Sequence, residues 1–170
     1  GAYVIVARGW SANQIVEAGI RTPLVFLPIS MQDLVYVLDQ ALAKAAKPNP
    51  RVGFIVYPQL QKELVALSSL LHVDLRIYPS GSDKEDMRRA IAQAVRDKVD
   101  VFIGGETSIA MAESMGLCCQ LLVCDEMSIR QALLEAKRIV YARELEQAQS
   151  LKFKTVIEHS HDGIVSLDAE

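Results

Sequence analysis

The sequence predicts an α/β fold with parallel sheets, and two observations support this prediction. Short apolar runs alternate with segments of helical periodicity along most of the chain. The composition is 51% hydrophobic but only 6% aromatic, and such an aliphatic bias is typical of buried parallel strands covered by helices. A chain of 170 residues has room for one ordinary domain or two small lobes.

The expected strands are short apolar runs bounded by turn-forming residues. They cover residues 3–6, 24–27, 52–56, 74–77, 101–103 and 121–124. Helical patterns separate most of these runs. The expected helices cover residues 11–18, 31–46, 83–98 and 129–149.

Each expected helix follows a serine that has Gln, Asp or Glu three positions later. This spacing is the signature of a capping box, in which the hydroxyl accepts a backbone N–H from the first turn. The serines are Ser11, Ser30, Ser82 and Ser128. Gly19, the Pro-containing segment 47–50 and Gly116 are expected to end helices.

Part of the chain resembles another part at one constant offset. Residues 3–11 align with residues 100–108, and the same offset relates Gly19 to Gly116. The alternative is a chance alignment of two strand–helix–strand units. If the repeat is real, the fold consists of two Rossmann-like lobes, as in periplasmic binding proteins, and the first lobe is truncated at its N-terminus. Strand ends and helix starts would then line a cleft between the lobes.

The expected organisation follows from this repeat. Residues 1–47 are assigned to the first lobe, 48–127 to the second lobe, 128–150 to a connector helix and 151–170 to the start of a further domain. Within the last segment we expect a short amphipathic helix, a turn at 162–163 and a strand at 164–167.

Composition and motifs exclude several classes of function. The net charge of −3 gives no basic footprint for nucleic acid, and no apolar run reaches the roughly 20 residues of a membrane span. Cys118, Cys119 and Cys124 fit neither a disulfide framework nor zinc-ligand spacing, so we expect reduced thiols and a cytoplasmic protein. No catalytic motif, metal site or cofactor site is predicted.

The candidate ligand-binding residues follow expected strands. A helix start favours an anion, arginine can bind a carboxylate with two hydrogen bonds, and glycine lets a ligand approach the backbone. The candidates are Arg8, Gly9, Ser11, Ser30, Tyr57, Gly105, Glu106 and Thr107. The alternatives are that the arginine and the glycines are ordinary turn residues and that the serines only cap helices. Trp10 either stacks on a ligand or packs beside the cap.

Several segments together resemble the N-terminal sensor domain of the propionate catabolism activator (PrpR) family. They are VIVARGWSA (4–12), EAGIRTPLVFLPIS (17–30), VGFIVYP (52–58), DVFIGGET (100–107) and MSIRQAL (127–133). The resemblance covers residues 3 to about 143. Residues 153–168 are similar to the start of a PAS domain.

This resemblance implies a sensor that closes on 2-methylcitrate or a similar anionic metabolite, with the candidate residues lining its cleft. It also implies later PAS, ATPase and helix-turn-helix domains, a homo-oligomer, and contact with DNA and sigma-factor polymerase only through those domains. Two features depart from a tricarboxylate site: Trp10 narrows the cleft where many relatives have glycine, and Glu106 repels anions. The other functions considered are a racemase- or aldolase-like enzyme using this cleft and a secreted solute-binding protein.

Overall fold

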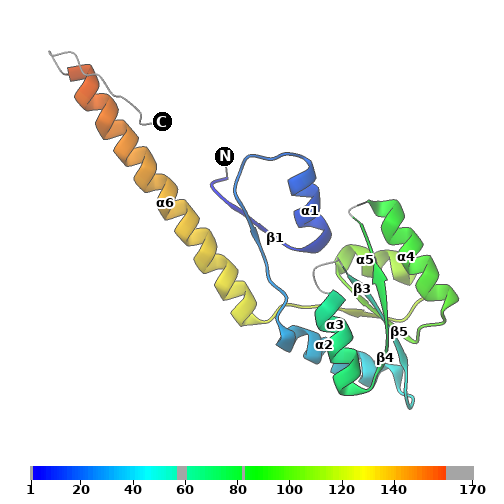
Figure 1. Ribbon diagram of the computed structural model, residues 1–170. Coiled ribbons are helices and arrows are strands. Elements are labelled where there is room, and N and C mark those ends of the chain that lie inside the picture. The colour runs from blue at the N-terminus through cyan, green and yellow to red at the C-terminus, as the bar shows by residue number, and fades with distance from the viewer. Residues whose placement is uncertain (1, 57–60, 82, 160–170) are drawn as a thin grey trace.

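The computed structural model describes residues 2–56, 61–81 and 83–159, in which strands and helices alternate (Figure 1). The elements are β1 (Ile5–Ala7), α1 (Gly9–Glu17), β2 (Leu24–Phe26), α2 (Met31–Ala45), β3 (Arg51–Val56), α3 (Gln61–Leu71), β4 (Asp74–Pro79), α4 (Lys84–Arg96), β5 (Val101–Gly104), α5 (Glu106–Ser114), β6 (Cys119–Leu121) and α6 (Glu126–His159). The predicted α/β fold class is confirmed.

The strands form two separate parallel sheets. One is two-stranded, with β1 beside β2, and the other is four-stranded, in the order β4-β3-β5-β6. In the larger sheet Val52 pairs with Leu75 on one side and with Val101 on the other. Because all pairs are parallel, the carboxyl ends of the strands in each sheet lie along one edge.

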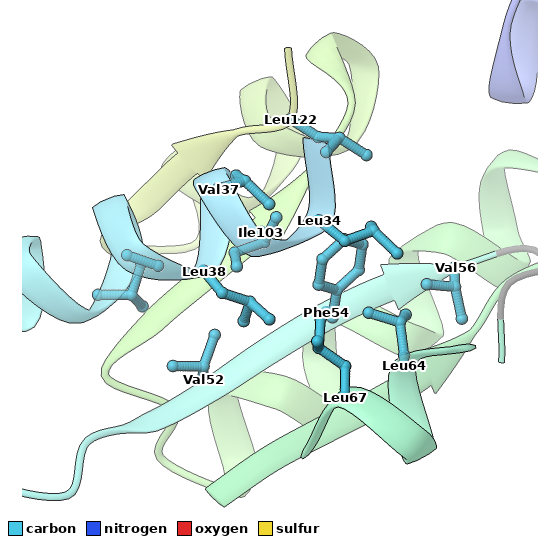
Figure 2. Packing of buried hydrophobic residues seen from close by; sticks show 12 residues of the cluster. Leu34, Val37, Leu38, Val52, Phe54, Val56, Leu64, Leu67, Ile103 and Leu122 are labelled. Carbon is cyan, nitrogen blue, oxygen red and sulfur yellow. The ribbon is translucent and has the colours of Figure 1, made fainter. Parts of the chain in front are cut away.

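Helices cover both faces of the four-stranded sheet. Helices α2 and α3 pack on one face, where Leu34 and Leu38 of α2 and Leu64 of α3 surround Phe54 of β3 (Figure 2). Helices α4 and α5 pack on the other face through a cluster that includes Ile91 and contacts between α5 and β5. Burial on both faces explains why these strands are continuous apolar runs rather than alternating ones.

The packing of α2 differs from the expected grouping of residues 1–47. Its apolar stripe completes the core of the four-stranded sheet, although residues 1–47 were expected to form the first lobe. The two-stranded sheet is covered instead by α6, whose Ala132 and Ala136 pack on Val25. The chain therefore crosses between the sheets twice, through segments 27–30 and 122–125.

The capping box at Ser30 is confirmed: its hydroxyl accepts the Asp33 N–H at 3.0 Å and the Asp33 carboxylate accepts the Ser30 N–H at 2.8 Å. The other starts are displaced. Helix α1 begins after Arg8 and α4 after Asp83, so Ser11 lies inside its helix, while Ser82 lies outside the described residues. Helix α6 begins two residues before Ser128, whose N–H donates to Asp125.

Other boundaries also differ from the prediction. Helix α3 was not predicted, and β6 occupies 119–121 rather than 121–124. Helix α6 continues without a break from the expected connector to His159, and its far half extends beyond both sheets (Figure 1). The predicted turn at 162–163 and strand at 164–167 lie outside the described residues.

The repeat has a structural counterpart. The offset that relates Ser11 to Ser108 also relates the N-caps of α1 and α5, which are Arg8 and Gly105. Both helices are followed by a glycine with positive φ, Gly19 at 62° and Gly116 at 84°. A side chain is strained in that conformation, so these positions favour glycine.

The N-terminal edge of the four-stranded sheet is expected to lose stability in acid. Lys47 and the Arg51 N–H hold the pKa of Asp100 below its ordinary value, and Arg51 does the same for Asp74. Both carboxyls have lower pKa values when folded than when unfolded, so their stabilisation is complete above the unfolded pKa of about 4 and is lost as pH falls through the folded values. Urea midpoints measured between about pH 3 and pH 7 should fall more steeply below about pH 4 for the native chain than for Asp100→Asn. Equal slopes for the two proteins would contradict the assignment.

Candidate functional site

A cavity of about 460 Å³ lies between residues of the two sheets. One wall comes from the end of β1 and the first turn of α1, and the other comes from the ends of β3 and β5 and the first turn of α5. The lining residues are Val6, Ala7, Arg8, Gly9, Trp10, Ser11, Leu27, Ile29, Phe54, Ile55, Val56, Ser80, Met87, Gly105, Glu106, Thr107, Ser108 and Leu122. The volume is within the usual range for pockets that hold small molecules.

Most of the predicted site residues meet in this cavity. Its lining includes Arg8, Gly9, Ser11, Gly105, Glu106 and Thr107, although they come from two distant parts of the chain. Ser30 is not among the lining residues, because its hydroxyl caps α2. Tyr57 lies outside the described residues. That any of them binds a ligand stays a prediction.

Arg8 links the wall at β1 to the second crossing segment. Its guanidinium donates to the Leu122 carbonyl at 2.8 Å and to the Cys124 sulfur. Burial raises the pKa of the Cys124 thiol, and the nearby Arg8 charge partly opposes this effect. The thiol also lies 3.6 Å from the carbonyl of Pro28 in the first crossing segment, so Arg8 and Cys124 together connect both crossings.

The Asp33 side chain also joins the two crossing segments, through three hydrogen bonds. Its carboxylate is buried, with 3% of the residue exposed, and it accepts the N–H groups of Ser30 and Asp125 and the hydroxyl of Ser128. The distances from the carboxylate to the two nitrogens are 2.8 and 2.7 Å. Hydrogen bonds to a buried charge are strong because little water competes for them. One side chain thus fixes the start of α2 against the start of α6.

Trp10 lines the cavity rather than filling it. Its indole packs against the core cluster of the four-stranded sheet that contains Met87, and the Lys84 ammonium lies 5.6 Å from the ring centroid. Trp10 therefore connects the wall at α1 to α4 at a place separate from the two crossings.

The apolar part of the cavity lining was not predicted from the sequence. Leu27 and Val56 were expected only as strand residues and Met87 only as a helix residue, and neither Ile29 nor Ser80 was among the candidate site residues. The available signal was position, since Leu27, Val56 and Ser80 lie at or just after the carboxyl ends of β2, β3 and β4.

The two adjacent glycines after β5 differ in their surroundings. A Cβ on Gly104 would overlap the Ser108 hydroxyl and lie 2.8 Å from Cγ2 of Ile55, whereas a Cβ on Gly105 would meet no atom within 4 Å. Gly105 has φ −79° and ψ 172°, which any residue adopts. Gly104 is therefore required by packing, and Gly105 leaves space in the cavity.

The described residues were also compared with the geometry of a metal site and of a membrane span. Within residues 2–56, 61–81 and 83–159, no group of His, Cys, Asp and Glu side chains is placed to hold a metal ion. Over the same ranges, no helix combines the length and hydropathy of a membrane span.

Comparison with known proteins gives a family and a fold. The family model described as propionate catabolism activator matches residues 1–146. A crystal structure of an NtrC family transcriptional regulator from Clostridium acetobutylicum is similar, with a TM-score of 0.73 over 84% of this chain and 73% of that chain. The two chains are 18% identical, so this likeness shows the fold alone. No curated protein matches the chain.

Proposed function

Because the chain belongs to the propionate catabolism activator family, we propose that it is the effector-binding sensory domain of a bacterial transcriptional regulator and that the effector occupies the cavity between the sheets. The observation that carries this proposal is the convergence of Arg8, Gly9, Ser11 and residues 105–107 on one cavity from two repeat-related turns. Core packing alone does not require charged and hydroxyl side chains to line such a space.

The mechanism is closure of two lobes. A ligand that touches both walls stabilises the closed arrangement in proportion to its greater affinity for that arrangement. The crossings at 27–30 and 122–125, held together by Asp33, serve as the hinge. Helix α6 starts at this hinge and packs on the β1–β2 sheet, so closure changes its direction relative to the four-stranded sheet.

The remaining parts of the function rest on the resemblance. We propose that α6 relays closure to a PAS domain, an ATPase domain and a DNA-binding domain in a cytoplasmic homo-oligomer. The sensory domain itself is not an enzyme in this proposal. Arg8 and Glu106 are the ionisable groups among the described lining residues, and they do not form an acid–base pair with each other.

The proposal is tested by thermal unfolding of the chain with a panel of small organic acids and amino acids. A ligand that binds only the folded state raises the melting temperature, and a hundredfold excess over Kd adds about 2.7 kcal/mol. At least one compound should stabilise the native chain and lose that effect with Gly105→Leu, which fills open space in the cavity. Arg76→Ala, which removes an exposed side chain of the edge strand β4, is the control and should keep the effect. If stabilisation by every active compound survives Gly105→Leu, the cavity is not the binding site.

Trp10 provides a direct readout of the contact between the cavity walls, since the chain has one tryptophan. A cation–π pair contributes about 0.5–1 kcal/mol at a partly exposed site, so Lys84→Ala should shift the equilibrium between open and closed forms up to about fivefold toward the open form. Acrylamide should then quench Trp10 fluorescence more strongly than in the native chain. Lys137→Ala removes an exposed lysine from α6 and should leave quenching unchanged. Unchanged quenching in Lys84→Ala would exclude Lys84 as part of the contact.

A further inference from the structure

Two opposite charges line the cavity, and neither has an ion-pair partner among the described residues. The Arg8 guanidinium donates to a carbonyl and a thiol, both uncharged. Over residues 2–56, 61–81 and 83–159, neither Arg8 nor Glu106 belongs to any of the ion pairs. A guanidinium has five N–H donors, so Arg8 retains donors beyond the two used here. A ligand therefore meets one positive and one negative group.

Among the described lining residues, Arg8 and Glu106 are the charged side chains, and no other described residue of the lining adds a charge. The other described lining residues are uncharged, and the sequence of segment 57–60 and residue 82 contains no ionisable side chain except the Tyr57 phenol. Lys84 contacts Trp10 and is not a lining residue. The described side chains that line the cavity thus carry one charge of each sign.

The two charges occupy the two repeat-related helix starts. Helix α1 has Arg8 as its N-cap and no acidic residue in its first turn, whereas α5 has Gly105 as its N-cap and Glu106 in its first turn. A helix start favours a nearby negative charge. At α5 the chain itself supplies that charge. At α1 the chain supplies the Arg8 guanidinium instead of a carboxylate. A carboxylate from a ligand therefore suits this side of the cavity.

The rest of the lining is largely apolar. Leu27, Ile29, Val56 and Met87 line the cavity together with Leu122. A tricarboxylate would place its second and third charges against these side chains or against Glu106, where they lose hydration and gain no cation.

We infer that the effector of this cavity is a small zwitterion: one carboxylate facing Arg8, one protonated amine facing Glu106, and an apolar body against the aliphatic wall. Amino acids with aliphatic or aromatic side chains have this chemistry. The inference rests on the proposed function, because it assigns a ligand class to the same cavity, and it replaces the tricarboxylate that the family resemblance implies.

The test compares four matched compounds by thermal unfolding and titration calorimetry on the whole chain. They are L-norleucine, hexanoate, which lacks its amine, pentylamine, which lacks its carboxylate, and citrate. L-norleucine should bind at least about tenfold more tightly than the other three, which corresponds to 1.4 kcal/mol or more. Glu106→Gln should weaken the binding of L-norleucine about tenfold. It should leave the binding of hexanoate unchanged or make it tighter. Glu113→Gln removes an exposed carboxylate from the same helix outside the cavity. This variant should bind the four compounds in the same order of affinity as the native chain.

Two outcomes overturn the inference and separate it from the proposed function. If citrate or hexanoate binds most tightly and Gly105→Leu abolishes that binding, the cavity is the effector site but the zwitterion class is wrong. If L-norleucine does not stabilise the chain, the zwitterionic ligand class is also wrong. The proposed function is then decided by the panel of organic acids and amino acids described above. If no compound in either panel shows stabilisation that Gly105→Leu removes, both proposals fail.

Discussion

Replacing Asp33 by asparagine is expected to lower the free energy of unfolding by about 3 kcal/mol, because a buried group that makes several charge-assisted hydrogen bonds is costly to disrupt. The carboxylate accepts from Ser30, Asp125 and Ser128, and the amide that replaces it has one oxygen to accept with. At least one buried donor on a crossing segment then faces an NH₂ group. Urea unfolding at neutral pH, followed by far-UV circular dichroism, measures this loss.

Asp39→Asn is the matched control, since Asp39 lies on the same helix and is exposed. It should change the free energy of unfolding by less than about 0.5 kcal/mol. If the two variants unfold at the same urea concentration, Asp33 does not hold the crossings together. Asp33→Asn should also increase acrylamide quenching of Trp10 below the unfolding transition, because a looser hinge separates the walls of the cavity more often.

The adjacent glycines after β5 should lose different amounts of stability when each is replaced by alanine. Gly104→Ala is expected to cost about 2 kcal/mol of stability, as overpacking in a filled core does. Its methyl group displaces the Ser108 hydroxyl, which donates to the Gly105 carbonyl at 2.8 Å, and lies too close to Ile55. Gly105→Ala has no such neighbour and should cost less than about 1 kcal/mol, the difference between a glycine and an alanine N-cap.

Chemical denaturation of the two variants measures the difference, and ligand titration gives a second readout. Gly105→Ala should weaken effector binding while the protein remains folded, whereas Gly104→Ala should lower stability with or without ligand. Equal stability of the two variants would show that the end of β5 adjusts to a side chain, and the assignment of Gly104 to core packing would be wrong.

The elements were predictable where their determinants are local. Apolar runs and helical periodicity located every strand to within a few residues, and the Ser30 cap was predicted because both partners of the box lie within three positions. The starts of α1 and α6 were misplaced for the opposite reason. Asp125 precedes α6 and its carboxylate accepts the Ser128 N–H, while its own N–H donates to Asp33 from a distant part of the chain.

The sheet on which α2 packs was not predictable from its own sequence. An apolar stripe containing Leu34, Val37 and Leu38 fits against either sheet equally well. Its position depends on the crossings and on α6, which covers the β1–β2 sheet in its place.

The candidate site was partly predictable from topology. Turns after parallel strands gather at one edge of each sheet, and two repeat-related lobes were expected to face each other across a cleft, so residues 8–11 and 105–107 were expected to lie on opposite walls of it. The aliphatic wall was not predicted, because an apolar residue that lines a cavity has the same sequence pattern as one that fills a core. Ser30 has the residue type of a ligand-binding group, but its hydroxyl is used in capping.

Because α6 is one unbroken helix, a small change of angle at its start produces a large displacement at its end. The helix spans Glu126–His159, and at 1.5 Å per residue it is about 50 Å long. Its base is clamped against the β1–β2 sheet by Ala132 and Ala136, and its far half extends beyond that sheet (Figure 1). A tilt of about 5° at the base displaces the tip by about 4 Å, a shift close to the one-turn ratchets that switch protein interfaces. Under the proposed function, a sub-ångström adjustment around a ligand would be amplified into a displacement of several ångströms at the far end of α6.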